Sequence, residues 1–183
     1  MKILHKLTLA AAAVLVAACA GNANRLTYTD HTNFYSPHLV RYVSQKGYFP
    51  VTIHGEPFGA DGSRQITENL TLPGSYEPVP FRKAGKEDIG RLVLFMDGKG
   101  IINGRRLCEA NEAIPTDLSG GEKIRVQAAF CYQDEMVSET VLTAVRPNSA
   151  DDPKFQRSLT EMTEVLFRTQ VPNGPGCRIS AAC

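Results

Sequence analysis

Apolar and polar residues alternate along the chain in a way that predicts several strands. Residues 48–55 place apolar side chains at every second position, as in a half-buried strand. The segment 91–97 contains an unbroken apolar run, residues 92–96, which is typical of a strand covered on both faces. Residues 122–131 and 136–145 predict two further strands, and the short polar segment between them has the length of a hairpin loop.

Three segments have the periodicity and end signals of helices. In the segment 36–47, Ser36 can cap a helix, proline follows it and glycine ends it. Residues 63–72 predict a second helix capped by Ser63. The clearest helix is expected over 151–168, where Asp152 precedes a proline and apolar residues recur at helical spacing. We expect residues 73–88 to be a loop and residues 101–108 to run back beside the strand before them.

This order of elements predicts one α+β domain over residues 36–172. The expected sheet is mixed or mainly antiparallel, with about four to five strands and helices packed on one face. A polar segment, residues 19–35, is expected to be a tether before the domain. Residues 173–183 are a tail rich in proline and glycine.

The N-terminus has the pattern of an export signal. Two lysines in the first six residues precede the uncharged stretch 7–18. A helix of that length spans roughly 18 Å, whereas a bilayer core of about 30 Å needs about 20 apolar residues. We therefore expect residues 1–18 to be a signal peptide that is removed after export.

Residues Val16-Ala17-Ala18-Cys19 resemble the lipobox of bacterial lipoproteins. The resemblance implies that the Cys19 thiol receives a diacylglycerol, that cleavage occurs just before Cys19, and that the new amino group then receives an acyl chain such as palmitate. Ala20 replaces the aspartate that usually retains such proteins in the inner membrane, which favours the outer membrane. The alternative is an ordinary signal peptide that is cut near Ala18 with an incidental cysteine.

The remaining cysteines suggest disulfides. An even number of cysteines in an exported chain favours two bridges among Cys108, Cys131, Cys177 and Cys183. Three connectivities are possible, and we favour Cys108–Cys131 together with Cys177–Cys183. Free thiols are the alternative.

The strongest candidate for ligand chemistry is the loop that contains His54, Glu56 and Asp61. It could hold a divalent metal or supply an acid–base pair, but the spacing matches no known metal motif and a structural turn is favoured. Cys131 as a nucleophile, with His54 or His38 as its base, is less favoured than a disulfide. The chain contains no GxSxG motif. We therefore predict no catalytic residues, no metal and no cofactor.

The charge balance argues against nucleic acid as a partner. The chain has 20 basic and 19 acidic residues, whereas nucleic-acid-binding domains usually carry a basic surplus. The segments Ile53–Phe58, Leu107-Cys108, Ala128–Cys131 and Leu166-Phe167 resemble a group of uncharacterised envelope proteins of alphaproteobacteria. This resemblance implies that Cys108 and Cys131 are partners, and it implies no activity.

Together these observations predict a membrane-anchored lipoprotein of the bacterial cell envelope that faces the periplasm. Its domain is expected to be a non-catalytic binding or assembly module with a protein partner in the envelope. The alternative is a periplasmic enzyme or metal-binding protein that uses the His54, Glu56 and Asp61 loop.

Overall fold

A computed structural model describes residues 24–98, 100–109, 114 and 121–170. The predicted signal peptide, Cys19, Cys177, Cys183 and the tail 173–183 lie outside the described residues. Among the residues that are described, no helix is long and apolar enough to cross a bilayer.

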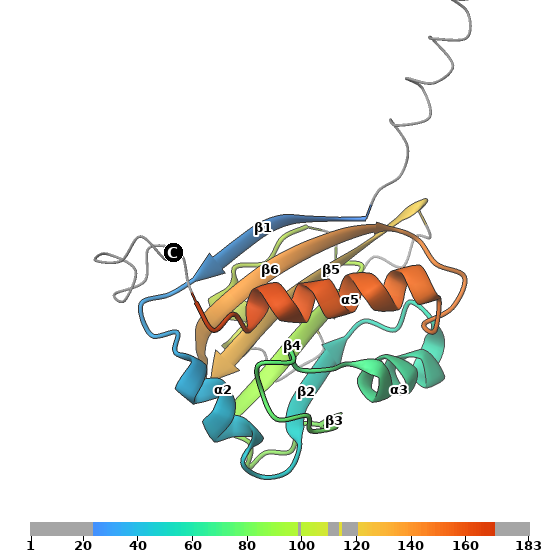
Figure 1. Ribbon diagram of the computed structural model, residues 1–183. Coiled ribbons are helices and arrows are strands. Elements are labelled where there is room, and N and C mark those ends of the chain that lie inside the picture. Colours follow the sequence, from blue (N-terminus) through green and yellow to red (C-terminus); the bar gives the residue numbers. More distant parts are fainter. Residues whose placement is uncertain (1–23, 99, 110–113, 115–120, 171–183) are drawn as a thin grey trace, which may run out of the picture.

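The described chain forms an α+β fold around one mixed sheet of six strands (Figure 1). The strands are β1 (Arg25–His31), β2 (Phe49–His54), β3 (Phe81–Lys83), β4 (Gly90–Met96), β5 (Lys123–Tyr132) and β6 (Glu135–Val145). The helices are α2 (Pro37–Ser44), α3 (Gly59–Asn69), α4 (Gly104–Glu109) and α5 (Pro153–Leu166).

The strand order across the sheet is β1-β6-β5-β4-β2-β3. Strand β2 is parallel to both β3 and β4, and the other neighbouring pairs are antiparallel. The parallel pairs require a crossover, which α3 supplies between β2 and β3.

The sheet has more strands than the four or five predicted, because two strands carry weak sequence signals. Strand β1 lies inside the segment that we expected to be a tether, so the fold begins earlier than residue 36. Most of its side chains are exposed, and it therefore lacks apolar alternation. Strand β3 has only three residues and lies in the proline- and glycine-rich segment that we expected to be a loop.

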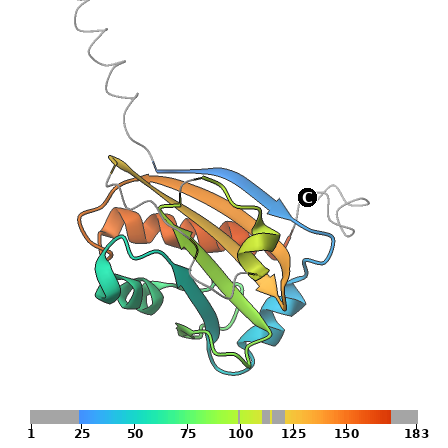
Figure 2. The same ribbon diagram turned by 180° about the vertical axis from the view of Figure 1, so that it is seen from behind.

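Helices cover both faces of the sheet. Helices α2, α3 and α5 lie over one face (Figure 1), while α4 lies on the other, as seen from behind in Figure 2. The main core lies between the sheet and helices α2, α3 and α5. A smaller core lies between the sheet and α4. The expectation that all helices share one face is therefore wrong for α4, which occupies the segment that we expected to return as a strand.

The helix ends agree with the sequence signals at two helices and differ at a third. The side chain of Ser36 caps α2, and that of Asp152 caps α5 by accepting hydrogen bonds from two backbone amides. Helix α3 begins at Gly59, before the expected cap Ser63, and no side chain caps it. Gly59 has a positive φ, which glycine adopts without strain and which lets the chain turn sharply into the helix.

Aromatic rings fix the end of α5 against the sheet. Phe49 of β2, Phe130 of β5 and Phe167 lie with ring centroids 5.2–5.8 Å apart. All three side chains are fully buried. This cluster joins strands from the parallel and the antiparallel parts of the sheet to the last helix.

Candidate binding surface

Helix α2 is held on the sheet by one face and presents its other face outward. Val40 and Val43 are buried in the core, whereas Tyr42 is half exposed. The helix packs very closely on the first residue of β4, because a Cβ atom at Gly90 would lie 2.2 Å from Val43 Cγ2. The orientation of Tyr42 is therefore set by packing on the opposite side of a short helix.

The turn between β5 and β6 brings a second aromatic side chain next to α2. Gln133 adopts a positive φ of 56° in this tight turn, and its backbone amide donates to the Ile89 carbonyl. Tyr132, at the end of β5, lies edge-on to Tyr42 with ring centroids 6.4 Å apart.

A hollow of about 790 Å³ lies between these elements and the chain that precedes α2. We call it the aromatic groove; it is lined by Phe34, Ser36, His38, Leu39, Tyr42, Tyr132, Gln133, Glu135 and Val137. A second hollow of about 330 Å³ is also lined by Tyr42, together with Ile89 and Lys46. Tyr42 is thus common to two concave surfaces.

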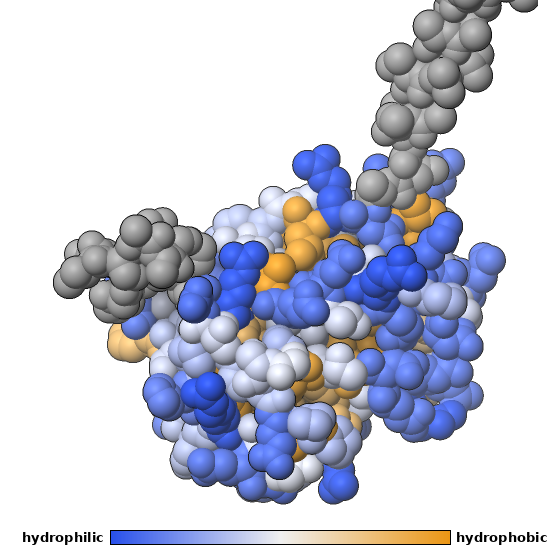
Figure 3. All heavy atoms as spheres, in the orientation of Figure 1, coloured by the Kyte–Doolittle hydropathy of each residue, from blue (hydrophilic) through white to orange (hydrophobic). Residues whose placement is uncertain are grey.

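Exposed apolar side chains gather at these hollows. The described residues include six large hydrophobic side chains that are well exposed, and three of them, Phe34, Tyr42 and Ile89, line one hollow or both. Phe34 is 77% exposed. Figure 3 shows one face of the molecule, on which hydrophilic side chains predominate and apolar ones form separate patches. A concave apolar patch with a polar rim is typical of a surface that binds another molecule.

A buried carboxylate borders the second hollow. Asp88 Oδ1 accepts hydrogen bonds from Lys46 Nζ at 2.8 Å and from the Tyr48 hydroxyl at 3.0 Å, and Oδ2 accepts from the Gly85 amide at 2.8 Å. Burial raises the pKa of Asp88, but these three donors outweigh it and the net pKa is lowered. The ionised carboxylate therefore fixes the chain between β3 and β4 and shapes the hollow.

The structure does not bring His54, Glu56 and Asp61 together as a ligand group. His54 ends β2, and its neighbours in register place it on the face of the sheet that carries α4. Glu56 is exposed in the following loop, and Asp61 lies in the first turn of α3, where it pairs with Arg64 at 3.3 Å. No group of three potential metal ligands occurs among the described residues.

His54 still has one notable property. Its Nε2 atom is buried without a hydrogen-bond partner among the described residues. Burial lowers the pKa of His54, and the positive charge of Arg91 lowers it further. The imidazole is therefore neutral near pH 7.

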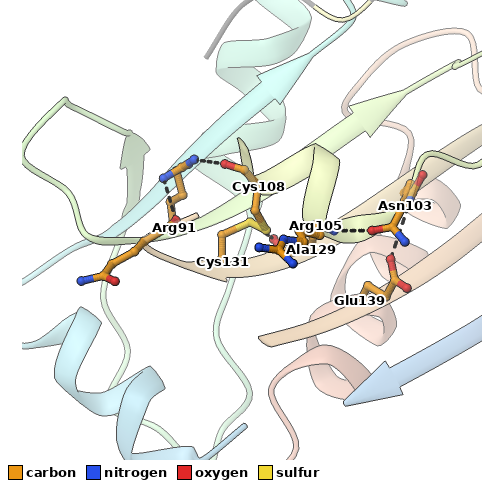
Figure 4. Close-up of a disulfide and its surroundings, with 9 residues drawn as sticks. Arg91, Asn103, Arg105, Cys108, Ala129, Cys131 and Glu139 are labelled. Atoms are coloured by element: carbon orange, nitrogen blue, oxygen red, sulfur yellow. Dashed lines mark hydrogen bonds between the residues drawn. A yellow bond between two sulfur atoms is a disulfide. The ribbon is translucent and has the colours of Figure 1, made fainter. Parts of the chain in front are cut away.

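Cys108 and Cys131 form a disulfide between α4 and β5, with Cα atoms 5.5 Å apart (Figure 4). Both residues are fully buried. This agrees with the favoured pairing and leaves Cys131 no free thiol for nucleophilic chemistry.

A buried carboxyl group that was not predicted from the sequence lies beneath α4. Glu139 of β6 is 9% exposed and faces the buried amide of Gln127. Burial raises the pKa of Glu139, and the nearby Asp30 adds to this, while hydrogen bonds from Tyr28, Gln127 and the Gly104 amide act in the opposite direction. The sequence signal for this buried carboxyl group is Glu139 itself, the one charged residue within the predicted strand 136–145.

Comparison of the chain with models of protein families, with curated proteins and with solved structures finds no significant match.

Proposed function

We propose that this protein is a lipid-anchored protein of the bacterial cell envelope whose periplasmic domain binds a partner protein through the aromatic groove. The anchor is a lipid on Cys19 that follows from the lipobox, with the outer membrane favoured over the inner one. The disulfide Cys108–Cys131 is compatible with an oxidising compartment such as the periplasm. The proposed role is recognition or assembly rather than catalysis.

The observation that carries this proposal is the concentration of exposed apolar side chains at the groove. Tyrosine and other aromatic residues supply a large share of the binding energy in protein interfaces, because they bury much area and lose little conformational entropy. Tyr42 and Tyr132 already pack edge to face with ring centroids 6.4 Å apart, so the aromatic surface is preorganised. A partner side chain that packs over this pair displaces water from both rings.

The rim of the groove supplies polar contacts that can set orientation. Ser36 caps α2 through its hydroxyl oxygen. Glu135 accepts a hydrogen bond from Arg105 at 3.3 Å and is held at the rim by it. Gln133 lies in the turn and His38 lies on the exposed side of α2. An apolar centre with a polar rim is the usual anatomy of a protein interface.

The alternative is a periplasmic enzyme or metal-binding protein that uses His54. The buried Nε2 atom of His54 favours it, but Glu56 and Asp61 are not assembled around that atom. An activity or bound metal that is lost in both His54→Ala and Glu56→Ala, in protein that remains folded, would support this alternative over the binding module.

The anchor is tested by labelling cells with palmitate and separating membranes. The wild type is expected to carry label and to sediment with membranes, and Cys19→Ala is expected to lose both properties. An unlabelled, soluble wild type would overturn the anchor.

The groove is tested with a photo-crosslinking amino acid at Tyr42 and, as a matched control, at Tyr28. These tyrosines are exposed by 50% and 46%, so accessibility alone does not distinguish them. We expect one discrete protein adduct from position 42, none from position 28, and loss of the adduct when Phe34→Ser is added. Equal adducts from both positions, or none from position 42, would contradict the proposal.

A further inference from the structure

We propose that the end of the sheet where β1 begins lies against the membrane, and that Arg25, Lys123 and Arg125 bind anionic phospholipid headgroups there. The inference rests on the proposed anchor and adds to it the orientation of the domain and the class of lipid. It assigns a second surface, distinct from the aromatic groove.

The three cationic side chains share one face of the sheet. Thr143 of β6 lies between Arg25 of β1 and Arg125 of β5 in the register of the three strands. Neighbouring strands are about 4.8 Å apart, so the Cα atoms of the two arginines lie roughly 10 Å apart. Lys123 is two residues from Arg125 on β5 and therefore points to the same face.

These three charges are available to an external anion. All three side chains are exposed, and none takes part in the ion pairs formed among the described residues. The nearby Arg146 differs, since it pairs with buried Asp97 at 2.6 Å and donates to the Gly121 and Lys123 carbonyls. The positive charge of Arg146 is therefore balanced by Asp97 within the protein.

Among the described residues one exposed acid, Glu122, lies beside the three cations, so the charge of this described group is still positive. Val145 adds an apolar element, because it lies opposite Lys123 in the register and is 40% exposed. Cationic side chains around an exposed aliphatic one are complementary to an anionic headgroup layer above acyl chains.

The length of the chain before β1 places this end near the bilayer. Only residues 20–24 separate Cys19 from Arg25, and the six residue steps between them span at most about 22 Å even when fully extended. A lipid on Cys19 therefore keeps the cations close to the headgroups. This proximity raises their effective concentration at the surface, so even weak contacts are populated.

The aromatic groove lies at the opposite end of the same strands. Strand β5 begins at Lys123 and ends at Tyr132, and ten residues of strand span about 30 Å. In Figure 1, β1 begins at the upper right, while α2 lies at the lower left. A domain that rests on its cationic end thus presents the groove away from the membrane.

The orientation is tested with a single tryptophan, because the sequence contains none. Acylated protein with Val145→Trp or Phe34→Trp is placed on vesicles of phosphatidylethanolamine and phosphatidylglycerol with brominated acyl chains. We expect strong quenching of the tryptophan at position 145 and little at position 34. Equal quenching at the two positions, or stronger quenching at position 34, would overturn the proposed orientation.

The lipid class is tested without the anchor. The mature chain from residue 19 onward, exported behind a cleavable signal of another protein and carrying Cys19→Ser, is sedimented with vesicles. We expect binding to vesicles that contain phosphatidylglycerol, weaker binding as salt rises, and little binding to pure phosphatidylcholine. Each charge removed is expected to weaken binding about fivefold, and the triple variant Arg25→Gln, Lys123→Gln, Arg125→Gln roughly 100-fold.

The matched control removes three exposed cations elsewhere, with Lys83→Gln, Lys86→Gln and Arg168→Gln. Equal losses in the two triple variants, or binding independent of phosphatidylglycerol, would overturn the headgroup site and leave an acidic protein as the partner to test. Failure of palmitate labelling would overturn the anchor alone, because the sedimentation experiment needs no acyl chain. The two failures are therefore distinguishable.

Discussion

The disulfide between Cys108 and Cys131 joins α4 to β5, and a hydrogen bond from the neighbouring strand β4 holds the same end of the helix. Arg91 lies opposite Cys131 in the β4–β5 register, and its guanidinium donates to the Cys108 carbonyl (Figure 4). The helix has only six residues and is too short to be stable by itself. Its place on the sheet therefore depends on the disulfide, this hydrogen bond and the small core beneath it.

Removing the disulfide is expected to destabilise the domain without changing its fold. The bridge closes a segment with a sequence separation of 23 residues. For a loop of this length, loss of the bridge lowers the free energy of unfolding by about 3 kcal/mol. Urea unfolding of Cys108→Ala, Cys131→Ala checks this. If the double variant and wild type unfold at the same urea concentration, and reducing agent does not shift the wild type either, the bridge contributes nothing.

Glu139 is expected to make stability depend on pH. Burial raises the pKa of Glu139, so the folded state binds this proton more tightly than the unfolded chain. Protonated Glu139 therefore stabilises the folded state fully at a pH below the ordinary glutamate pKa. This stabilisation is lost as the pH rises through the raised pKa of Glu139 in the folded state. Unfolding free energies of wild type and Glu139→Gln, measured between pH 4 and pH 8, are expected to diverge in favour of the variant as pH rises. Parallel curves would show that Glu139 titrates normally.

The N-terminal cap of α5 is expected to contribute about 1 kcal/mol. Asp152 Oδ1 accepts hydrogen bonds from the Lys154 and Phe155 amides, both at 2.9 Å. Asp152→Ala leaves these amides without that acceptor and lowers the unfolding free energy by about 1 kcal/mol. The neighbouring exposed residue gives the control Asp151→Ala, which should be near neutral in thermal unfolding. A similar loss in both variants would point to general charge effects.

Gly90 is expected to tolerate no larger side chain. A Cβ atom there meets Val43 of α2 at 2.2 Å, so the helix must move outward. Gly90→Ala is therefore expected to destabilise the domain by about 1–3 kcal/mol. The same shift displaces Tyr42, so the photo-crosslink from that position should weaken.

Gly74 provides the matched control for this substitution. A Cβ atom at Gly74 has no neighbour within 4 Å. Gly74→Ala should leave both urea unfolding and the crosslink unchanged. If Gly90→Ala does the same, the close packing of α2 on β4 is not what orients Tyr42.

The sequence predicted the elements whose signals are local. Helix α5 combines a cap, a proline and an apolar stripe, and its start lies where Asp152 indicates. Strand β5 alternates over its first half, and the residues expected on one face are buried in the main core: Ile124, Val126, Ala128 and Phe130. In both cases the same residues that bury apolar area also mark the element.

The missed elements depend on partners distant in sequence. Strand β1 is mostly exposed, and its place in the sheet comes from pairing with β6, more than a hundred residues later. Helix α4 has only two apolar residues in six, Leu107 and Cys108, and is held by the bridge to Cys131. No local pattern distinguishes such segments from a tether or a strand.

The candidate site was missed for a related reason. The aromatic groove combines Phe34, the outer face of α2 and the turn after Tyr132. Each of these aromatic residues is unremarkable in its own segment. The packing of Val43 on Gly90 and the β5–β6 pairing bring Tyr42 and Tyr132 together, and the Thr32 amide, which donates to the Val137 carbonyl, holds the segment of Phe34 beside them.

The pairing of the first strand with the last one also fixes an order of events during synthesis. Residues 25–31 find their partner only when residues 138–143 have left the ribosome. A chain that emerges N-terminus first therefore holds β1 unpaired through most of its synthesis, and contacts this distant in sequence form slowly. Its polar, exposed side chains suit that delay, because an unpaired strand with little apolar surface is a poor nucleus for aggregation.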